Sequence, residues 1–254
     1  MGPVQILIVS DIHANLEALQ SCLDAAPRFD RIFNLGDLVG YGANPNEVIE
    51  RVRALGNVFV RGNHDKACAG VAAPEGFNPV ASMAVLWTKK FLSPDSSEFL
   101  RTLPKGPIAP MDGVECVHGS ARDEDEYILV ARDAYPLLAE TRTPVTFFGH
   151  THIQGAFAMD EEKEHWNVMV PHYDSAVGLQ RFTLHMKEKT RYLINPGSVG
   201  QPRDNDARAA FVLYDTAEGS ITFYRVPYDI RTAQKKILHA GLPDKLAERL
   251  AEGR

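Results

Sequence analysis

Cysteine is scarce in this chain of 254 residues, which contains only Cys22, Cys68 and Cys116. The three are odd in number and lack the paired spacing of a zinc ribbon or of a disulfide-stapled domain. Long hydrophobic runs are also missing. The apolar stretch Val4–Val9 is too short for a signal sequence and lacks a basic leader, and nothing approaches the roughly 20 apolar residues of a membrane-spanning helix. We therefore expect a reducing, cytoplasmic location and no membrane partner.

An excess of basic residues is absent as well. The chain has 27 lysines and arginines against 33 aspartates and glutamates, a net charge of −6. This balance argues against stable nucleic-acid binding, which usually requires a basic surface. A small phosphorylated substrate stays compatible with it, because bound metal ions can supply local positive charge. The length and the 44% hydrophobic content are sufficient for a substantial buried core.

The first part of the chain alternates short apolar runs with helical patterns, which predicts a mostly parallel sheet covered by helices. Strands are expected at Val4–Ser10, Arg31–Leu35 and Asn57–Arg61, with helices at Asn15–Ala26 and Pro45–Leu55. The pattern then breaks in a helical insertion at about 66–105, which includes a helix at Pro79–Phe91. Further expected elements are strands at Gly113–Val117 and Val145–Phe148 and an acidic helix over Ala121–Glu140.

From Ile153 onward, strand-like segments follow one another with little room for helices, which indicates antiparallel pairing. They are Ile153–Met159, Leu179–Met186, Arg191–Ile194, Ala209–Tyr214 and Ile221–Val226. A helical tail at about 230–254, interrupted near Pro243, ends the chain. We expect a single domain over residues 1–254.

Five short polar motifs each follow directly after an expected strand. They are Asp11-Ile12-His13, Gly36-Asp37, Gly62-Asn63-His64-Asp65, Val117-His118-Gly119 and Gly149-His150-Thr151-His152. Sites in open α/β sheets form beyond the carboxyl ends of strands, so these motifs are expected to converge. Aspartate, histidine and asparagine are suitable ligands for divalent metals. The motifs supply seven strong candidate ligands. These are too many for one ion, but they suit two ions that share a carboxylate, an arrangement used for displacement at phosphorus.

Each motif alone has a simpler explanation. A Gly-Asp pair after a strand is more often a turn, and a lone histidine such as His118 is more often a partly buried side chain than a ligand. The hypothesis of a two-metal site therefore depends on the ordered combination of motifs, because five weak signals at successive strand ends are not expected by coincidence.

The ordered set resembles the calcineurin-like metallophosphoesterase family, whose blocks run D-x-H, G-D, G-N-H-[DE], H and G-H-x-H. The later segment Asn195–Arg203 resembles a block of the small prokaryotic phosphodiesterase branch. The resemblance implies a four-layer α/β/β/α sandwich of two mixed sheets flanked by helices.

Ligand sets and chemistry also follow from the resemblance. A first metal would bind Asp11, His13, Asp37 and His152, and a second would bind Asp37, Asn63, His118 and His150. Mn, Fe, Zn, Ni or Co suit these ligands, and Mn is expected to support activity. In this chemistry a metal-bridging hydroxide attacks phosphorus in line. His64 is the candidate general acid, and Asp65 either orients His64 or supports the turn.

One departure bears on the substrate. Protein phosphatases of this superfamily carry G-D-x-x-D-R-G at the second block, whereas this chain has Gly36-Asp37-Leu38-Val39-Gly40-Tyr41-Gly42. The missing arginine favours small phosphodiesters or nucleotides. The alternatives are a phosphomonoesterase or protein phosphatase of the same superfamily, a mononuclear zinc hydrolase, and an inert scaffold of the same fold.

Two further residues are candidates for substrate binding. Asn15 is placed to contact a phosphate oxygen or, equally, to cap the following helix. Arg203 is placed to hold a phosphate, although a solvent-exposed arginine is the commoner case. The composition is also compatible with a homo-oligomer.

Overall fold

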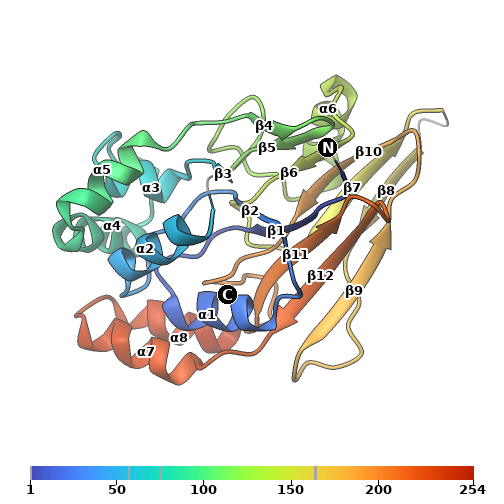
Figure 1. Cartoon of the computed structure of the whole chain (residues 1–254). Helices are drawn as coiled ribbons and strands as arrows, with labels where there is room; N and C mark the ends of the chain where they lie inside the picture. The colour runs from blue at the N-terminus through green and yellow to red at the C-terminus, as the bar shows by residue number, and fades with distance from the viewer. Residues whose placement is uncertain (1, 57, 75, 163–164) are drawn as a thin grey trace.

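The computed structural model of the protein describes residues 2–56, 58–74, 76–162 and 165–254. These residues form two six-stranded sheets that pack face to face, with helices on the outer surfaces (Figure 1). Both sheets contain parallel and antiparallel pairs. The predicted four-layer sandwich of two mixed sheets is therefore confirmed. Within the described residues, no helix is both long and apolar enough to cross a membrane.

The first sheet has the strand order β3-β2-β1-β11-β12-β9. Its strands are β1 (Gln5–Val9), β2 (Arg31–Asn34), β3 (Val58–Phe59), β9 (Gln180–His185), β11 (Ala209–Asp215) and β12 (Ser220–Val226). The first three strands pair in parallel, as the alternation of strands and helices predicts, and the others pair antiparallel. Asn57, where the third strand was expected to begin, lies outside the described residues.

The second sheet has the order β4-β5-β6-β10-β7-β8. Its strands are β4 (Ile108–Met111), β5 (Val114–Cys116), β6 (Val145–Phe147), β7 (Gly155–Asp160), β8 (His165–Met169) and β10 (Thr190–Asn195). β5, β6 and β10 pair in parallel. The carboxyl ends of parallel strands from both sheets thus open at the same end of the sandwich, which is where the polar motifs lie.

Alternation along the strands divides the core into layers. Ile6 and Ile8 of β1 pack between the sheets, against residues such as Phe147 of β6. The intervening Leu7 and Val9 face outward and pack beneath the helices. This period of two gives each sheet a buried inner face and a helix-covered outer face.

The outer helices fall into three groups. α1 (Leu16–Ala25) and α2 (Pro45–Leu55) cover the first sheet, and α6 (Ala131–Glu140) covers the second. After the third motif come α3 (Asn63–Cys68), α4 (Pro79–Phe91) and α5 (Pro94–Thr102). The C-terminal helices α7 (Ile230–His239) and α8 (Asp244–Glu252) pack against α4, so the end of the chain contributes to the layer that surrounds the motifs (Figure 1).

The acidic helix expected over Ala121–Glu140 is wrong in its first half. Only Ala131–Glu140 is helical, and residues 121–130 form a loop. Side chains bind the backbone there: Ser120 Oγ accepts from the amides of Arg122 and Asp123, and Asp123 Oδ1 accepts from the amide of Asp125. Such local bonds offer the backbone an alternative to the helix.

Candidate metal centre

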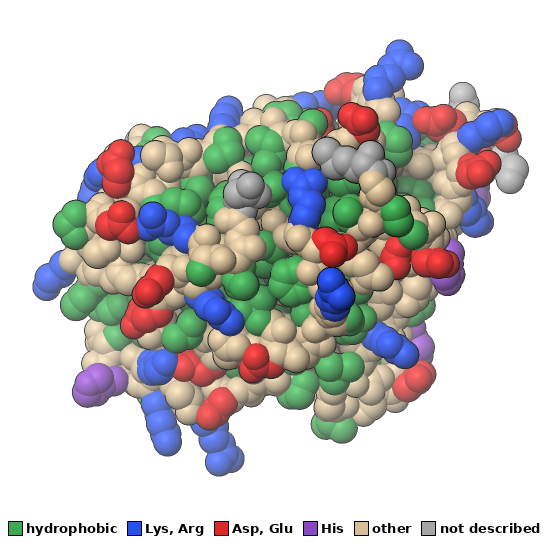
Figure 2. All heavy atoms as spheres, in the orientation of Figure 1, with side chains coloured by type: hydrophobic (Ala, Val, Ile, Leu, Met, Phe, Trp, Pro, Cys, Tyr) green, Lys and Arg blue, Asp and Glu red, His purple; other side chains and the backbone are tan. Residues whose placement is uncertain are grey.

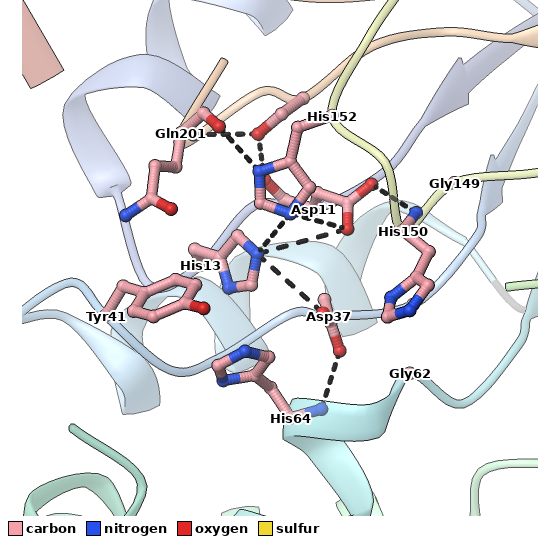
Figure 3. A network of polar contacts seen from close by, with 12 residues as sticks. Asp11, His13, Asp37, Tyr41, Gly62, His64, Gly149, His150, His152 and Gln201 are labelled. Atoms are coloured by element: carbon pink, nitrogen blue, oxygen red, sulfur yellow. Dashed lines mark hydrogen bonds and ion pairs between the residues drawn. The ribbon is translucent and has the colours of Figure 1, made fainter. Parts of the chain in front are cut away.

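The five motifs meet at one end of the sandwich. Asp11 follows β1, Asp37 follows β2, Asn63 follows β3, and His118 and the His150-Thr151-His152 segment follow β5 and β6. All seven proposed ligands are buried: Asp11, His13, Asp37, Asn63, His118, His150 and His152. Their convergence, visible for most of them in Figure 3, follows from the parallel pairing of the strands that precede them.

Four of these residues form a first group of ligand atoms. Asp11, His13, Asp37 and His152 offer donor atoms that all lie within 4.8 Å of one another. The Nε2 atoms of His13 and His152 are 3.0 Å apart, and Nε2 of His152 lies 3.3 Å from Oδ1 of Asp11. Nε2 of His13 lies 3.7 Å from Oδ2 of Asp37. This is a compact N/O set of the kind that holds a divalent transition metal.

A second group shares Asp37 with the first. Asp37, His118 and His150 also offer donor atoms within 4.8 Å of one another. Nε2 of His118 lies 3.5 Å from Oδ2 of Asp37, and Oδ1 of Asn63 lies 3.3 Å from the same nitrogen. Asp37 therefore stands between two donor sets.

Backbone carbonyls orient three of the imidazoles. Nδ1 of His13, His118 and His152 lies 3.1, 2.8 and 2.6 Å from the carbonyl oxygens of Val39, Leu35 and Gln201, respectively. Donation of the Nδ1 proton to a carbonyl leaves the Nε2 lone pair directed into the group. In His150 the two ring nitrogens exchange roles. Its Nε2 lies 3.2 Å from the carbonyl oxygen of Asp125, so Nδ1 is the nitrogen that remains for a metal. Sequence motifs carry no sign of these carbonyl partners.

The backbone at the ligands is held in an uncommon conformation. Asp11, His13, Asp37, His150 and His152 all have positive φ, between 49° and 67°. For residues with a Cβ this conformation is disfavoured by about 1–2 kcal/mol each. Strain of this kind gathers at functional sites, where the surrounding structure enforces it.

A separate observation also indicates that the first donor group suits a bound cation. Oδ1 of Asp11 is buried and has no hydrogen-bond partner among the described residues. An unpartnered buried carboxylate oxygen is costly. It faces Nε2 of His152 in the first group, so a metal ion placed there would satisfy it.

Charge among the two donor groups is concentrated on a few side chains. Burial raises the pKa of Asp37, but the neighbouring His118, His64 and His13 together lower it further, so that the pKa falls well below its usual value. Burial lowers the pKa of His118, yet Asp37, Asp11 and the carbonyl of Leu35 together outweigh this and raise it to about 10. Burial lowers the pKa of His150 to about 3. Asp37 is therefore an anion at neutral pH, as a bridging ligand must be.

Two glycines allow the chain to approach the ligands closely. A Cβ on Gly62 would lie 2.1 Å from Oδ1 of Asp37, and one on Gly36 would lie 2.8 Å from Nδ1 of His118. No side chain fits in either place. The glycines of the second and third motifs are therefore required by the geometry of the ligands beside them.

His64 lies beside the two groups. Its ring stacks on Phe77, with centroids 4.7 Å apart, and contacts Tyr41 at 4.4 Å. Nδ1 of His64 is buried and has no hydrogen-bond partner among the described residues. Burial lowers its pKa to about 4, and Asp37 opposes the shift.

Asp65 supports two turns. Its Oδ1 accepts from the amides of Leu38 and Val39 at 2.9 and 3.3 Å, and its Oδ2 accepts from the amide of Gly62 at 3.1 Å. Of the two roles considered for Asp65, this geometry is that of turn support, which fixes the second motif against the third.

The two residues predicted to bind substrate, Asn15 and Arg203, differ in their surroundings. Asn15 caps α1: its Oδ1 accepts from the amide of Ala18, and its Nδ2 donates to the carbonyl of Gly200. Both ends of the amide are engaged, so the capping alternative is the one observed. Arg203 is half-buried, not solvent-exposed, and its guanidinium lies over the ring of Tyr41.

A cavity of about 180 Å³ opens over the centre. Its lining includes the proposed ligands Asp37, Asn63, His150 and His152, together with His64, Phe77, Tyr41, Tyr127, Arg203 and Arg249. Phe77, Tyr127 and Arg249 were not expected from the sequence. Tyr127 comes from the loop that replaces the expected helix and packs on His150, with ring centroids 3.9 Å apart. No motif marks these residues, because they reach the site only through packing.

Comparison with known proteins agrees with this geometry. A model of the calcineurin-like phosphoesterase superfamily domain matches residues 4–219. The crystal structure of a metallophosphoesterase from Sphaerobacter thermophilus is similar over 100% of both chains, with 40% identity and a TM-score of 0.87. An uncharacterized protein of Methanocaldococcus jannaschii is 37% identical over 98% of both chains.

A more limited similarity concerns a named enzyme. The symmetrical bis(5'-nucleosyl)-tetraphosphatase of Erwinia tasmaniensis is 36% identical over 115 residues, which are 41% of this chain and 39% of that protein. The family match covers most of the chain and includes all five motifs. The chain therefore belongs to the calcineurin-like phosphoesterase superfamily, whose members are metal-dependent phosphoesterases.

Proposed function

We propose that this protein is a binuclear metal-dependent phosphoesterase that hydrolyses small phosphodiesters or nucleotides. One observation carries the proposal: two buried donor groups share the carboxylate of Asp37. The first would hold one ion through Asp11, His13, Asp37 and His152, and the second would hold another through Asp37, Asn63, His118 and His150. A single-ion site would leave the second group without a purpose.

When bound, two divalent ions supply an activated water and positive charge toward the phosphoryl oxygens. Mn is the ion we expect to support activity, and Fe, Zn, Ni and Co suit the same ligands. The chain contributes the other groups. His64 faces the same cavity as the ligands and is the residue we assign to the leaving oxygen. An anionic substrate beside it would raise its low pKa and favour proton donation.

The surroundings of the centre support a small substrate. Phe77 and Tyr127 come from separate segments and line the cavity of about 180 Å³, where they restrict access to the two donor groups. Lys66 and Arg61 bind Glu124 and thereby hold the loop that carries Tyr127 in place. The limited similarity to a bis(5'-nucleosyl)-tetraphosphatase favours nucleotides among small substrates.

The alternatives have weaker support. A protein phosphatase is disfavoured because Tyr41 stands where that branch has its arginine. An inert scaffold is disfavoured because the complete set of proposed ligands is buried together with His64.

A cytoplasmic location is supported by Cys22, Cys68 and Cys116, which are buried and free of disulfides. Figure 2 shows acidic and basic side chains interspersed over one face, a pattern that agrees with a small-molecule substrate.

A substrate panel tests the proposal. The metal-free protein is loaded with Mn and assayed with bis-p-nitrophenyl phosphate, a dinucleoside polyphosphate and a phosphoserine peptide, with a chelator control. We expect kcat/KM to be highest for one of the first two substrates and to vanish with the chelator. A clear preference for the peptide would overturn the choice of substrate, and full activity with the chelator would overturn the metal requirement.

A further inference from the structure

Two arginines from distant parts of the chain line the cavity over the ligand groups. Arg203 follows the segment Asn195–Pro202, and Arg249 lies on α8. The family match ends at residue 219, so Arg249 belongs to a segment beyond it. The structure thus brings a charged group from the C-terminal helix to the mouth of the proposed metal centre.

α8 is held firmly where it presents Arg249. Leu246 and Leu250 are buried in the cluster formed by α4, α7 and Tyr41. The amide of Asn205 donates to the carbonyl of Gly253 at 2.9 Å, which ties the end of α8 to the segment that carries Arg203. The two guanidinium groups are therefore positioned by the fold and do not depend on a mobile tail.

Neither arginine has an ion pair with an aspartate or glutamate side chain among residues 2–56, 58–74, 76–162 and 165–254. Nη2 of Arg203 donates to Oε1 of Gln201 at 3.2 Å and to the hydroxyl of Tyr41 at 3.4 Å, and Nε of Arg249 donates to the carbonyl of Arg254 at 2.6 Å. None of these partners is an aspartate or glutamate side chain, and the oxygen of Arg254 belongs to the last residue of the sequence. Nε of Arg203 is buried without a hydrogen-bond partner among the described atoms.

Three other arginines that are buried or partly buried have acidic partners. Arg61 pairs with Glu124 at 3.0 Å, Arg208 binds Asp206 at 2.9 Å, and Arg225 binds Asp204. Compared with these three, Arg203 and Arg249 are two like charges that line one cavity, and neither is paired with an aspartate or glutamate side chain among the described residues. Burial and the nearby Arg203 both lower the pKa of Arg249, which reflects this repulsion. An anion between them would relieve it.

We propose that Arg203 and Arg249 form a subsite for a second phosphate of the substrate, beside the phosphoryl group bound at the ligand groups. The inference rests on the proposed function and narrows it to substrates with a phosphoanhydride chain, such as nucleoside or dinucleoside polyphosphates. A lone phosphodiester carries one negative charge, which two divalent ions already exceed. Each further phosphate adds about one charge and offers oxygens for the planar fork of a guanidinium.

The test compares two charge-removing variants on the same helix. Arg249→Gln keeps most of the side-chain length, and Lys245→Gln makes the same charge change at an exposed position of α8. Both metal-loaded variants are assayed with a dinucleoside polyphosphate and with bis-p-nitrophenyl phosphate. For Arg249→Gln we expect the ratio of the two kcat/KM values to shift about 10–100-fold against the polyphosphate, mostly through KM, as for loss of a charge-assisted bidentate contact. For Lys245→Gln we expect no shift in the ratio.

A binding measurement separates this inference from the proposed function. Calorimetry follows α,β-methylene ADP, whose P–C–P bridge resists hydrolysis, binding to the metal-loaded wild type and variants. If the wild type hydrolyses neither substrate but Arg249→Gln weakens binding at least tenfold, the subsite stands and the proposed function fails. The subsite is overturned if the wild type does not bind the analogue, if Arg249→Gln binds it as tightly as the wild type, or if both substrates lose activity equally.

Discussion

Asp37 is the residue that links the two ligand groups. It contacts Nε2 of His13 on one side and Nε2 of His118 on the other, and it is fully buried. The substitution Asp37→Asn removes the negative charge that both ions would share, so both should be lost together. Elemental analysis of the dialysed protein should find close to no metal in this variant.

A matched variant makes this prediction sharper. Asp11 belongs to the first group only. Asp11→Asn is therefore expected to weaken one ion and leave the other in place. Retention of one full equivalent by Asp37→Asn would contradict the bridging role.

His64 is expected to act on the leaving group. His64→Ala should keep its metals, since the ring belongs to neither donor group. Loss of a general acid typically slows turnover about 10²–10⁴-fold, and the loss should be largest for alkyl leaving groups of high pKa. Aryl phosphates, whose leaving groups depart without full protonation, should suffer less. An equal loss for both classes, measured as kcat, would show that His64 only binds phosphate.

At this scale the sequence predicts which polar side chains come together, but it does not predict the residues that surround them. The seven ligands lie in short motifs after strands, and the topology of parallel strands brings them together. The carbonyl partners of His13, His118 and His152 belong to residues whose identity carries no signal. Arg249 reaches the cavity only because α8 packs on α4, a tertiary contact that no local pattern encodes.

Among the secondary-structure elements, long periodic segments were predicted and short or interrupted ones were missed. α1, α2 and α4 follow clear helical patterns, whereas β4 (Ile108–Met111) contains Pro110 and pairs irregularly with β5. The loop over residues 121–130 has a helical composition, but its side chains bind the backbone and Arg61 and Lys66 bind Glu124. Contacts between residues distant in sequence determine the conformation of these segments, and local propensity does not.

The segment before β11 gives a prediction about pH. Although partial burial raises the pKa of Asp206, its bonds to Arg208 lower it below 3.8. A carboxylate with a lowered folded-state pKa adds stability above its unfolded pKa of about 3.9, and this stability is lost as pH falls through the folded value. Asp206→Asn should therefore lower stability at pH 7 by about 1–3 kcal/mol.

The difference between Asp206→Asn and the wild type should shrink as the pH is lowered below about 4, in denaturant unfolding at each pH. Asp215→Asn serves as a control, because Asp215 accepts bonds from Gln5 and from turn amides and lies away from this arginine pair. A difference that stays constant from pH 7 to pH 3 would contradict the assignment.

At the scale of the whole molecule, the proposed centre joins the two sheets. Asp11 and Asp37 come from the first sheet, and His118, His150 and His152 come from the second. Ions bound between them should stabilise the fold against unfolding. At a free metal concentration of 100 times Kd, linkage gives about 2.7 kcal/mol for one site, or roughly 5–10 °C in Tm for a chain of this size.

Thermal unfolding with Mn and with a chelator measures this effect. The wild type should show the higher Tm with Mn, and Asp37→Asn should show little difference between the two conditions. A wild-type Tm that does not respond to metal would mean that the two buried groups do not bind it.

The central claim is that two ions per chain support phosphoester hydrolysis. The most direct measurement titrates the metal-free protein with Mn and follows hydrolysis of bis-p-nitrophenyl phosphate against the equivalents added. We expect activity to be absent without metal and to reach its plateau at two equivalents per chain. A plateau at one equivalent, or full activity before any metal is added, would contradict it.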